Sequence, residues 1–313
     1  MLPFLDAAQC APRSKGQRLL ISRARVFNAI ESVIYLNFVI QSDQYLGIFR
    51  SERLLKMKIG SPNLPDSPQG RSHFGLALCL AARAESILLA RGAGFDFVVV
   101  DMEHGPLGLS DLGQVAGTGI AAGLPVYGRV TGPNSGDIAR VLDCGATGVI
   151  VPHVDTLEQA QNIAALCRFA PNGRRALPGP LPALDYGIVP AGELCARAEA
   201  GTQVIAMIES AQALENVDQI AATPCIDMLM IGSNDLADGI GRRGDLNHED
   251  VRQAFGRIAK AAQKNNCDFG VMGLPPELVA PYALDLGAAA IVVTNDTNLI
   301  VEGGAAALAK VRR

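Results

Sequence analysis

The sequence predicts an α/β fold, a (β/α)8 TIM barrel preceded by an N-terminal extension of unassigned structure. Short apolar runs rich in β-branched residues alternate with alanine-rich amphipathic stretches, which is typical of βα units around a parallel sheet. The apolar runs are continuous rather than alternating, and this indicates strands that are covered on both faces. Eight such runs fall within about 240 residues, a length that fits a closed barrel better than an open sheet.

The expected elements follow the chain in order. We expect strands at 74–80, 95–100, 125–130, 148–151, 204–208, 228–231, 269–272 and 290–293. Amphipathic stretches between them predict helices, among them 135–144, 157–169, 211–222 and 250–265. The first strand is the least well defined, because residues 76–88 would also fit one helix. The segment 173–187 has a length suited to a lid or a subunit contact.

The composition of the chain changes near residue 57. Up to that point eight Lys and Arg stand against four Asp and Glu, whereas the remainder carries 19 against 27. A run rich in Pro, Gly and Ser follows at 59–70, as in a linker. We therefore predict an extension over 1–57, a linker over 58–72 and the barrel over 73–313. The extension is interpreted as an accessory segment or as a mis-assigned start ahead of Met57, with a basic transit peptide as the alternative.

The charge, hydropathy and cysteine pattern exclude several classes of protein. A net charge of −4 disfavours nucleic acid as a partner. The sequence has no apolar run near the roughly 18 residues of a membrane span, so we expect no membrane partner. Seven scattered cysteines without a C-x-x-C pair indicate reduced thiols and a cytoplasmic protein.

Polar residues collect where a barrel of this type carries its active site, at the carboxyl ends of the strands. Any one of them has a structural explanation as a helix cap or a salt bridge, but several at one rim indicate function. They are Asp101, Glu103 and His104 after the second run, Arg129 in the third, Glu209 after the fifth, and Ser233, Asn234 and Asp235 after the sixth. His153 follows the fourth run at the same rim, where we expect either a supporting or a structural role.

Two of these carboxylates suggest a metal site. Glu209 and Asp235 are 26 residues apart, about one βα unit, which places them on adjacent strand ends. Neighbouring carboxylates repel, so either one pKa rises or a cation lies between them. Oxygen ligands suit Mg²⁺ or Mn²⁺ better than zinc, and such an ion stabilises an enolate.

The remaining rim residues suit a small 2-oxo acid. Arg129 presents a planar fork of donors for a carboxylate or enolate oxygen, and His104 is suited to proton transfer. Backbone N–H groups at Gly232–Ser233–Asn234–Asp235 would open a helix and could hold a carboxylate. Together these groups predict enolate chemistry.

Five motifs of the sequence together resemble those of a known family. The motifs are Asp-Met-Glu-His-Gly-Pro at 101–106, Leu-Asp-Cys-Gly-Ala at 142–146, Val-Pro-His-Val at 151–154, Ile-Glu-Ser at 208–210 and Ile-Gly-Ser-Asn-Asp-Leu at 231–236. In this order and spacing they resemble the HpcH/HpaI aldolases, the metal-dependent class II pyruvate aldolases of the citrate lyase beta superfamily. The resemblance covers about residues 72–313.

The resemblance implies reversible cleavage of 4-hydroxy-2-oxo acids to pyruvate and an aldehyde. The implied substrates are of the 2-keto-3-deoxy sugar acid or 2,4-dihydroxyhept-2-enedioate type. Glu209 and Asp235 match the metal ligands, for Mg²⁺ or Mn²⁺ with Co²⁺ as a further candidate. The resemblance also implies a homo-oligomer, a hexamer in which neighbours contribute to the active site.

The remaining roles are carried over in the same way. Arg129 matches the arginine that stabilises the enolate, and the backbone at Gly232, Ser233 and Asn234 matches the carboxylate site. His104 matches a histidine that assists proton transfer and is held by the residues matching Asp101 and Asp143.

Two positions depart from the family pattern, and two other functions stay open. Met207 stands where many members have glutamine, and Asn234 where alanine or serine is common. The first change removes a polar contact beside the metal, and the second alters the aldehyde side of the pocket. The alternatives are a CoA-ester lyase of the citrate lyase beta type and a non-catalytic barrel that binds a metabolite.

Overall fold

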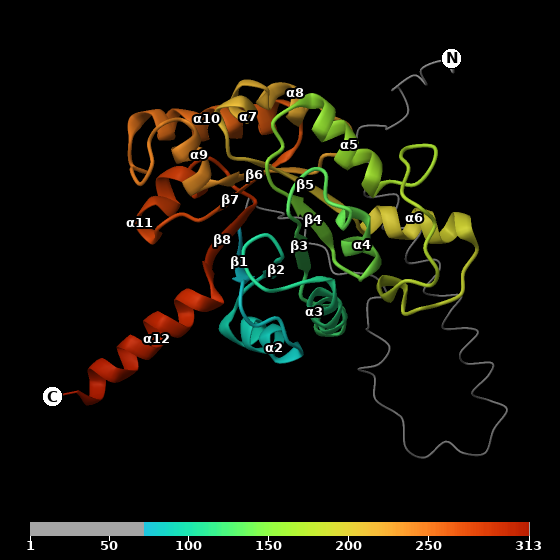
Figure 1. Ribbon diagram of the computed structural model, residues 1–313, viewed down its shortest axis with the longest axis horizontal. Helices are drawn as coiled ribbons and strands as arrows, with labels where there is room; N and C mark the ends of the chain where they lie inside the picture. The colour runs from blue at the N-terminus through green and yellow to red at the C-terminus, as the bar shows by residue number, and fades with distance from the viewer. Residues whose placement is uncertain (1–71, 313) are drawn as a thin grey trace. The chain divides into compact units, whose positions relative to one another are not determined.

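Eight parallel strands close into a barrel in sequence order, as Figure 1 shows. The computed structural model describes residues 72–312, so the predicted extension and nearly all of the predicted linker lie outside the described residues. The strands are β1 (His73–Leu78), β2 (Phe97–Asp101), β3 (Val126–Arg129), β4 (Gly148–Val151), β5 (Gln203–Ile208), β6 (Met228–Gly232), β7 (Asp268–Met272) and β8 (Ala290–Asn295). The predicted (β/α)8 barrel is confirmed.

Helices follow the strands and lie around the barrel, except the last, which extends away from it (Figure 1). They are α2 (Ala84–Ala93), α3 (Leu109–Ala122), α4 (Ile138–Asp143), α5 (Leu157–Cys167), α6 (Ala191–Gly201), α7 (Ala211–Glu215), α8 (Val217–Ala221), α9 (Ser233–Gly239), α10 (Glu249–Lys264), α11 (Pro276–Val279) and α12 (Asp296–Val311). Two short helical turns, η2 (Pro182–Leu184) and η3 (Ala280–Leu284), complete the described elements.

The strands are apolar throughout because they separate two cores. Side chains that point into the barrel, such as Phe97, Val99 and Met207, form one buried cluster. Their neighbours in sequence, such as Val98 and Val100, point outward and pack against the helices. A strand buried on both faces needs no polar alternation, so the polar residues at the strand ends stand out.

The least certain strand and one expected helix differ in detail from the sequence prediction. The run over 76–88 divides into the end of β1 at Leu78 and α2, which begins at Ala84. The predicted helix 211–222 is two short helices, α7 and α8, which meet at Asn216. Residue Asn216 adopts non-helical angles, and its side chain donates to the carbonyl of Asp155 at 2.8 Å.

The long segment between α5 and β5 lies at the end of the barrel opposite the carboxyl rim. Arg168 pairs with Asp227, which directly precedes β6, and Arg175 pairs with Asp143, which precedes β4. Both contacts are at strand beginnings. The segment therefore does not cover the rim of its own barrel as a lid would, and the expected subunit contact stays a prediction.

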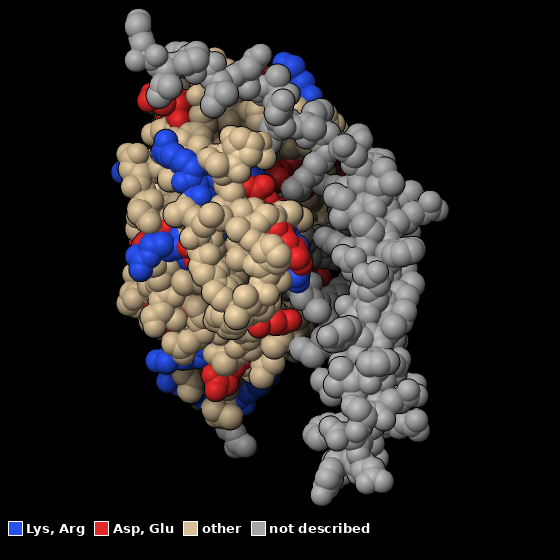
Figure 2. All heavy atoms as spheres, turned by 90° about the vertical axis from the view of Figure 1, so that its right-hand side faces the viewer, with Lys and Arg blue, Asp and Glu red and all other residues tan. Residues whose placement is uncertain are grey.

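The described surface carries mixed charge. Figure 2 shows the side that lies on the right in Figure 1, where blue and red residues alternate among uncharged ones. Ion pairs between residues three or four apart occur on the described surface, including Arg140 with Asp137 and Arg197 with Glu193. Among the residues that the structure describes, no helix combines the length and apolar character that a membrane span requires.

Two glycines on one helix predict opposite effects of the same substitution. A Cβ on Gly119 of α3 would lie 2.5 Å from Val126 Cγ2 and 2.7 Å from the Leu124 carbonyl oxygen, whereas one on Gly117 meets nothing within 4 Å. We expect Gly119→Ala to lower the free energy of unfolding by about 1–3 kcal/mol through overpacking. Gly117→Ala should raise it by about 0.5–1 kcal/mol through helix propensity. Urea unfolding measures both, and equal effects at the two positions would contradict the packing.

Candidate active site

A buried ion pair between neighbouring strands forms the centre of the rim. Asp101 ends β2 and Arg129 ends β3, and the two are paired in register. Arg129 Nε donates to Asp101 Oδ1 at 3.0 Å, and its Nη2 donates to Oδ2 at 2.5 Å. Asp101 is 1% exposed and Arg129 6%. This is a bidentate contact between a guanidinium and a carboxylate, and it fixes the plane of the guanidinium.

Strand alternation explains why both side chains face inward. Phe97, Val99 and Tyr127 fill the barrel interior below them, and residues two further along a strand point to the same side. Asp101 and Arg129 therefore continue the inward-facing sets of β2 and β3 at the last position before the loops. The same alternation brings Glu209 above Met207 on β5.

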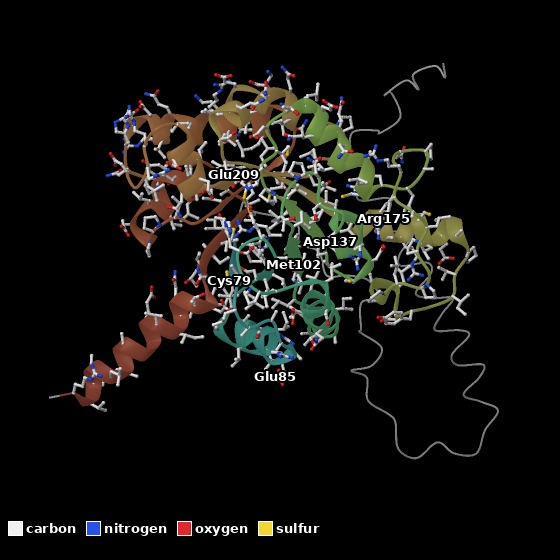
Figure 3. The ribbon with its side chains drawn as sticks, in the orientation of Figure 1. Cys79, Glu85, Met102, Asp137, Arg175 and Glu209 are labelled. Atoms are coloured by element: carbon white, nitrogen blue, oxygen red, sulfur yellow. The ribbon has the colours of Figure 1, made fainter. Side chains whose placement is uncertain are left out.

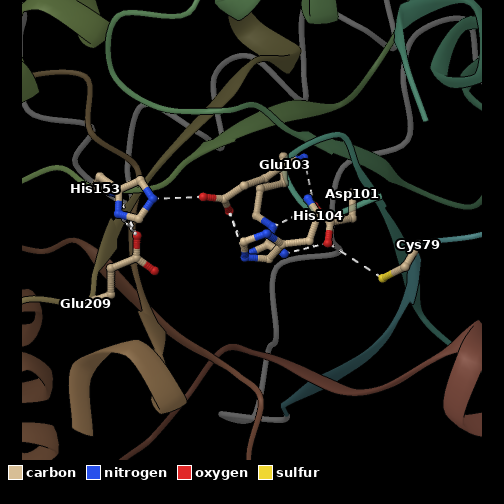
Figure 4. Close-up of polar contacts among 7 residues, drawn as sticks. Cys79, Asp101, Glu103, His104, His153 and Glu209 are labelled. Atoms are coloured by element: carbon tan, nitrogen blue, oxygen red, sulfur yellow. Dashed lines mark hydrogen bonds and ion pairs between the residues drawn. The ribbon is translucent and has the colours of Figure 1, made fainter. Parts of the chain in front are cut away.

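Glu103 and His153 connect this pair to Glu209 (Figure 4). Arg129 Nη1 lies 2.9 Å from Glu103 Oε2, and His153 Nε2 lies 2.9 Å from Glu103 Oε1. The other ring nitrogen, His153 Nδ1, lies 2.8 Å from Glu209 Oε1. The His153 backbone N–H also donates to that oxygen at 2.7 Å. Dashed lines in Figure 4 show His153 standing between the two carboxylates.

The backbone at His153 is part of this contact. Its φ is +58°, in the left-handed region that a histidine rarely adopts. This conformation, just after β4, lets the N–H and the ring meet one carboxylate. Backbone of this kind is found where surrounding contacts hold it, often at functional sites.

Charge and burial set the pKa values of the ion pair. Burial would raise the pKa of the Asp101 carboxyl, but the hydrogen bonds and charge of Arg129 and the N–H groups of His104 and Glu103 outweigh it and lower the pKa. Burial likewise acts to lower the pKa of Arg129, and the charges of Asp101, Glu103 and Glu209 raise it. Both groups are therefore held in their charged forms.

Glu209 has the opposite balance. Its carboxyl is buried, and this burial raises its pKa above the ordinary value. The negative charges of Glu103 and Asp235 raise the pKa further, against the opposing effect of His153. The negative charges that act on Glu209 favour a cation bound near it.

The donor set fits a hard divalent cation. A Cβ on Gly232, at the end of β6, would stand 2.5 Å from Glu209 Oε2. A larger residue there would displace this oxygen. Asp235, on the first turn of α9, is exposed and close enough for its charge to act on Glu209. Within residues 72–312 no three His, Cys, Asp or Glu side chains are arranged to hold a metal together. Two carboxylates would therefore leave the other coordination positions to water and substrate, as Mg²⁺ requires.

The expected carboxylate site lies beside Glu209. Gly232 precedes α9, whose first residue Ser233 is buried and donates its hydroxyl to the Met272 carbonyl at 2.8 Å. Asn234 is exposed, with its amide toward the backbone of Gly273. The backbone N–H groups of this turn are the available donors, because the hydroxyl of Ser233 is already engaged.

Met207 is fully buried inside the barrel. Its sulfur lies 3.3 Å from the Cβ position of Gly232, directly below the carboxylate of Glu209. The floor of the site is therefore apolar at Met207, where the family resemblance led us to expect glutamine.

His104 lies at the rim with an accessible ring. Its backbone N–H donates to Asp101 Oδ1 at 3.2 Å, while the ring is 67% exposed and 3.9 Å from Glu103 Oε2. The implied support by Asp101 is thus made to the backbone of His104 rather than to its imidazole.

Asp143 lies elsewhere on the chain. It ends α4 and precedes β4, and its carboxylate accepts from the buried Arg175 at 2.7 Å. Figure 3 shows Arg175 near α6, apart from Glu209 and Cys79. The structure therefore brings together Asp101, His104, Arg129, Glu209 and the 232–235 turn, and leaves Asp143 at the other end of the barrel.

The sequence assigned no role to two residues of this site. Glu103 was one of three ionisable groups after the second strand, and Cys79 directly follows β1. Cys79 Sγ donates to Asp101 Oδ2 at 3.6 Å. The signal that could have found Cys79 is the inward alternation of β1, on which Ala77 points into the barrel.

Comparison with known proteins identifies the family. The family model HpcH/HpaI aldolase/citrate lyase matches residues 78–297. The chain belongs to this family. The predicted resemblance is confirmed, and the matched range ends at the start of α12.

Named relatives and solved structures of the HpcH/HpaI family agree with the match. A 4-hydroxy-4-methyl-2-oxoglutarate aldolase of Hapsidospora irregularis is 33% identical and covers 75% of this chain and 88% of its own. A hydroxypyruvate/pyruvate aldolase of Paraburkholderia phytofirmans is 34% identical, covering 76% and 93%. The crystal structure of an HpcH/HpaI aldolase/citrate lyase family protein from Burkholderia cenocepacia has a TM-score of 0.70 at 29% identity, covering 78% and 96%.

The lowered pKa of Asp101 predicts an acid-dependent loss of stability. Below its ordinary value of 3.8, the unfolded carboxyl binds more protons than the native one, so the free energy of unfolding falls as the pH falls through this window. Asp101→Asn should remove this slope and, near pH 7, cost about 3–5 kcal/mol by breaking a buried pair. Urea midpoints between about pH 6 and pH 3 measure both. Asp137→Asn, which breaks an exposed pair with Arg140, is the control, and an unchanged acid slope in Asp101→Asn would contradict the assignment.

Proposed function

We propose that this barrel cleaves 4-hydroxy-2-oxo acids reversibly into pyruvate and an aldehyde. Family membership and the aldolase relatives confirm the predicted carbon–carbon lyase. They also support a divalent metal in general. The proposal adds the ligands Glu209 and Asp235 and the ions Mg²⁺ or Mn²⁺.

A bound cation would polarise the 2-oxo group and stabilise the enolate. Arg129 would bind the same oxygen region of the substrate, with its guanidinium already oriented by Asp101. The backbone N–H groups of the 232–235 turn would bind the carboxylate. These contacts would place the C3–C4 bond at the carboxyl rim of the barrel.

Cleavage also requires two proton transfers. The 4-hydroxyl must lose its proton as the C3–C4 bond breaks, and the electron pair of that bond becomes the enolate. Carbon 3 of the enolate then takes up a proton and gives pyruvate. His104 is the group proposed for the first transfer, because its ring is exposed at the rim and an imidazole can serve as a general base.

The observation that carries the proposal is the continuous set of contacts from Asp101 to Glu209. Arg129, Glu103 and His153 connect the group that would bind the oxo acid to a carboxylate with a raised pKa. Each comes from a different strand end, as in other catalytic barrels.

A metal-dependent release of pyruvate tests the proposal. We expect wild-type protein with Mg²⁺ or Mn²⁺ to release pyruvate from a 4-hydroxy-2-oxo acid of the 2-keto-3-deoxy sugar acid type, and EDTA to stop it. Glu209→Gln and Asp235→Asn should each lower kcat/KM by about 100-fold or more, because each removes a ligand carboxylate. A coupled lactate dehydrogenase assay measures the release.

Asp238→Asn is the matched control for Asp235→Asn, since it lies one turn along α9 in an exposed pair. Its activity should equal that of wild type. Pyruvate release that EDTA and Glu209→Gln leave unchanged would contradict the metal site. Cleavage of an acyl-CoA ester alone would favour the CoA-ester lyase, and binding without turnover the non-catalytic barrel.

We also propose that the protein is a cytoplasmic homo-oligomer, a hexamer in the family pattern. The last helix supports assembly: α12 has no buried residue and extends away from the barrel in Figure 1. Its exposed apolar side chains are Leu299, Ile300, Val301, Leu308 and Val311, and α2 exposes Leu88 and Leu89. A second copy of this chain would cover such a surface.

Charge placed on α12 should weaken the assembly. We expect sedimentation velocity to show wild-type protein well above the 32.8 kDa of one chain. Leu299→Asp together with Leu308→Asp should shift it toward smaller species, because a buried unpaired charge opposes association. Lys310→Gln, on the same helix, should leave the assembly unchanged. A monomeric wild type at micromolar concentration would contradict the proposal.

A further inference from the structure

We propose that Asp296 is a positioning residue of the active site, which acts through Cys79 and Gly105 on Asp101 and His104. Asp296 is the first residue of α12, and its position more than 200 residues from Cys79 gave no sign of this contact in the sequence. The inference rests on the proposed function, because it concerns how that site is held.

Three successive backbone N–H groups converge on this one carboxylate. Asp296 Oδ1 accepts from Cys79 N at 2.9 Å. Its Oδ2 accepts from Leu80 N at 3.0 Å and from Ala81 N at 2.9 Å. The segment 79–81, directly after β1, belongs to no helix or strand. The bonds to Asp296 therefore replace the backbone hydrogen bonds that a sheet would supply.

The held segment contacts the ion pair through its first residue. Cys79 Sγ donates to Asp101 Oδ2, the oxygen that also accepts from Arg129 Nη2. A thiol at this place adds one donor to a carboxylate that must hold Arg129 in one plane. If Cys79 moved, the Asp101 carboxylate would lose this hydrogen-bond donor on its side toward β1.

A second contact leads from the same residue to His104. A Cβ on Gly105 would stand 2.5 Å from the Cys79 carbonyl oxygen, and Gly105 has a φ of +137°. Only glycine accepts both conditions. The loop that carries Glu103 and His104 therefore rests directly on the backbone that Asp296 holds.

The charge of Asp296 matters as well as its shape. An amide has one accepting oxygen, so Asp296→Asn would turn an NH₂ group toward at least one N–H donor. Asp296→Glu keeps the charge but moves the carboxylate by one methylene, so it cannot keep all three bonds in place. The two variants separate loss of charge from loss of position.

Alkylation of Cys79 reports the position of the segment without any catalysis. Burial and the charges of Asp101 and Asp296 raise the pKa of this thiol to about 12, so it should react slowly with iodoacetamide near pH 8. We expect Asp296→Asn and Asp296→Glu each to raise the rate at Cys79 by roughly tenfold, followed by peptide mass spectrometry. The same variants should lower kcat/KM for pyruvate release roughly tenfold, mainly in kcat, because a displaced Arg129 stabilises the enolate less.

Two matched controls exclude a general loss of stability. Asp96→Asn removes a carboxylate that accepts from Phe74 N at 2.9 Å, at the opposite end of β1. Asn295→Ala removes the cap of α12, whose oxygen accepts from Asn298 N. Both should lower the urea midpoint while Cys79 alkylation and kcat/KM stay within about twofold of wild type.

A double variant tests whether Asp296 acts through Cys79. If it does, Asp296→Asn combined with Cys79→Ala should lose little more kcat/KM than Asp296→Asn alone, because the two changes remove one connection. Fully multiplicative losses would mean that the two residues act separately, and would overturn this part of the proposal.

Other outcomes separate this inference from the proposed function. If wild-type protein releases no pyruvate, the proposed function fails, while the Cys79 alkylation comparison still decides the contact. If alkylation and kcat/KM in both Asp296 variants match those of Asp96→Asn, the positioning role is overturned even in an active aldolase.

Discussion

The active site depends on a guanidinium buried at the end of two parallel strands. Arg129 carries its charge into the barrel mouth with 6% exposure, at a place where an unpaired charge would cost several kcal/mol. Asp101 offsets this cost by pairing with Arg129, because the β2–β3 register places the two residues side by side. The pair is then a fixed frame, and every other group of the rim is placed relative to it.

Negative charge exceeds positive charge around that frame. Glu103 shares Arg129 with Asp101, and His153 lies between Glu103 and Glu209. The carboxyl of Glu209 is buried with two carboxylates near it, so its pKa is raised. A divalent cation bound at this place would relieve the repulsion and would supply Lewis acidity suited to enolate chemistry.

Sequence patterns predicted the barrel and most of its site for a physical reason. Strands buried on both faces are apolar, so Asp101, Arg129 and Glu209 were visible as interruptions at strand ends. Asp143 came only from the family resemblance, and it lies at the end of α4 rather than after a strand. Sequence reasoning missed the break between α7 and α8, where Asn216 bonds to a residue 61 positions away.

The sequence by itself determined the fold class, the family and the rim that carries the candidate site, because periodicity and local motifs are properties of neighbouring residues. Only the tertiary structure decided which side chains meet across the barrel. His153 contacts two carboxylates from a left-handed backbone conformation. Asp296 binds the loop at 79–81, more than 200 residues earlier in the sequence. The contact of Asp296 arises from closure of the barrel, which brings β1 beside β8. No local pattern records these contacts.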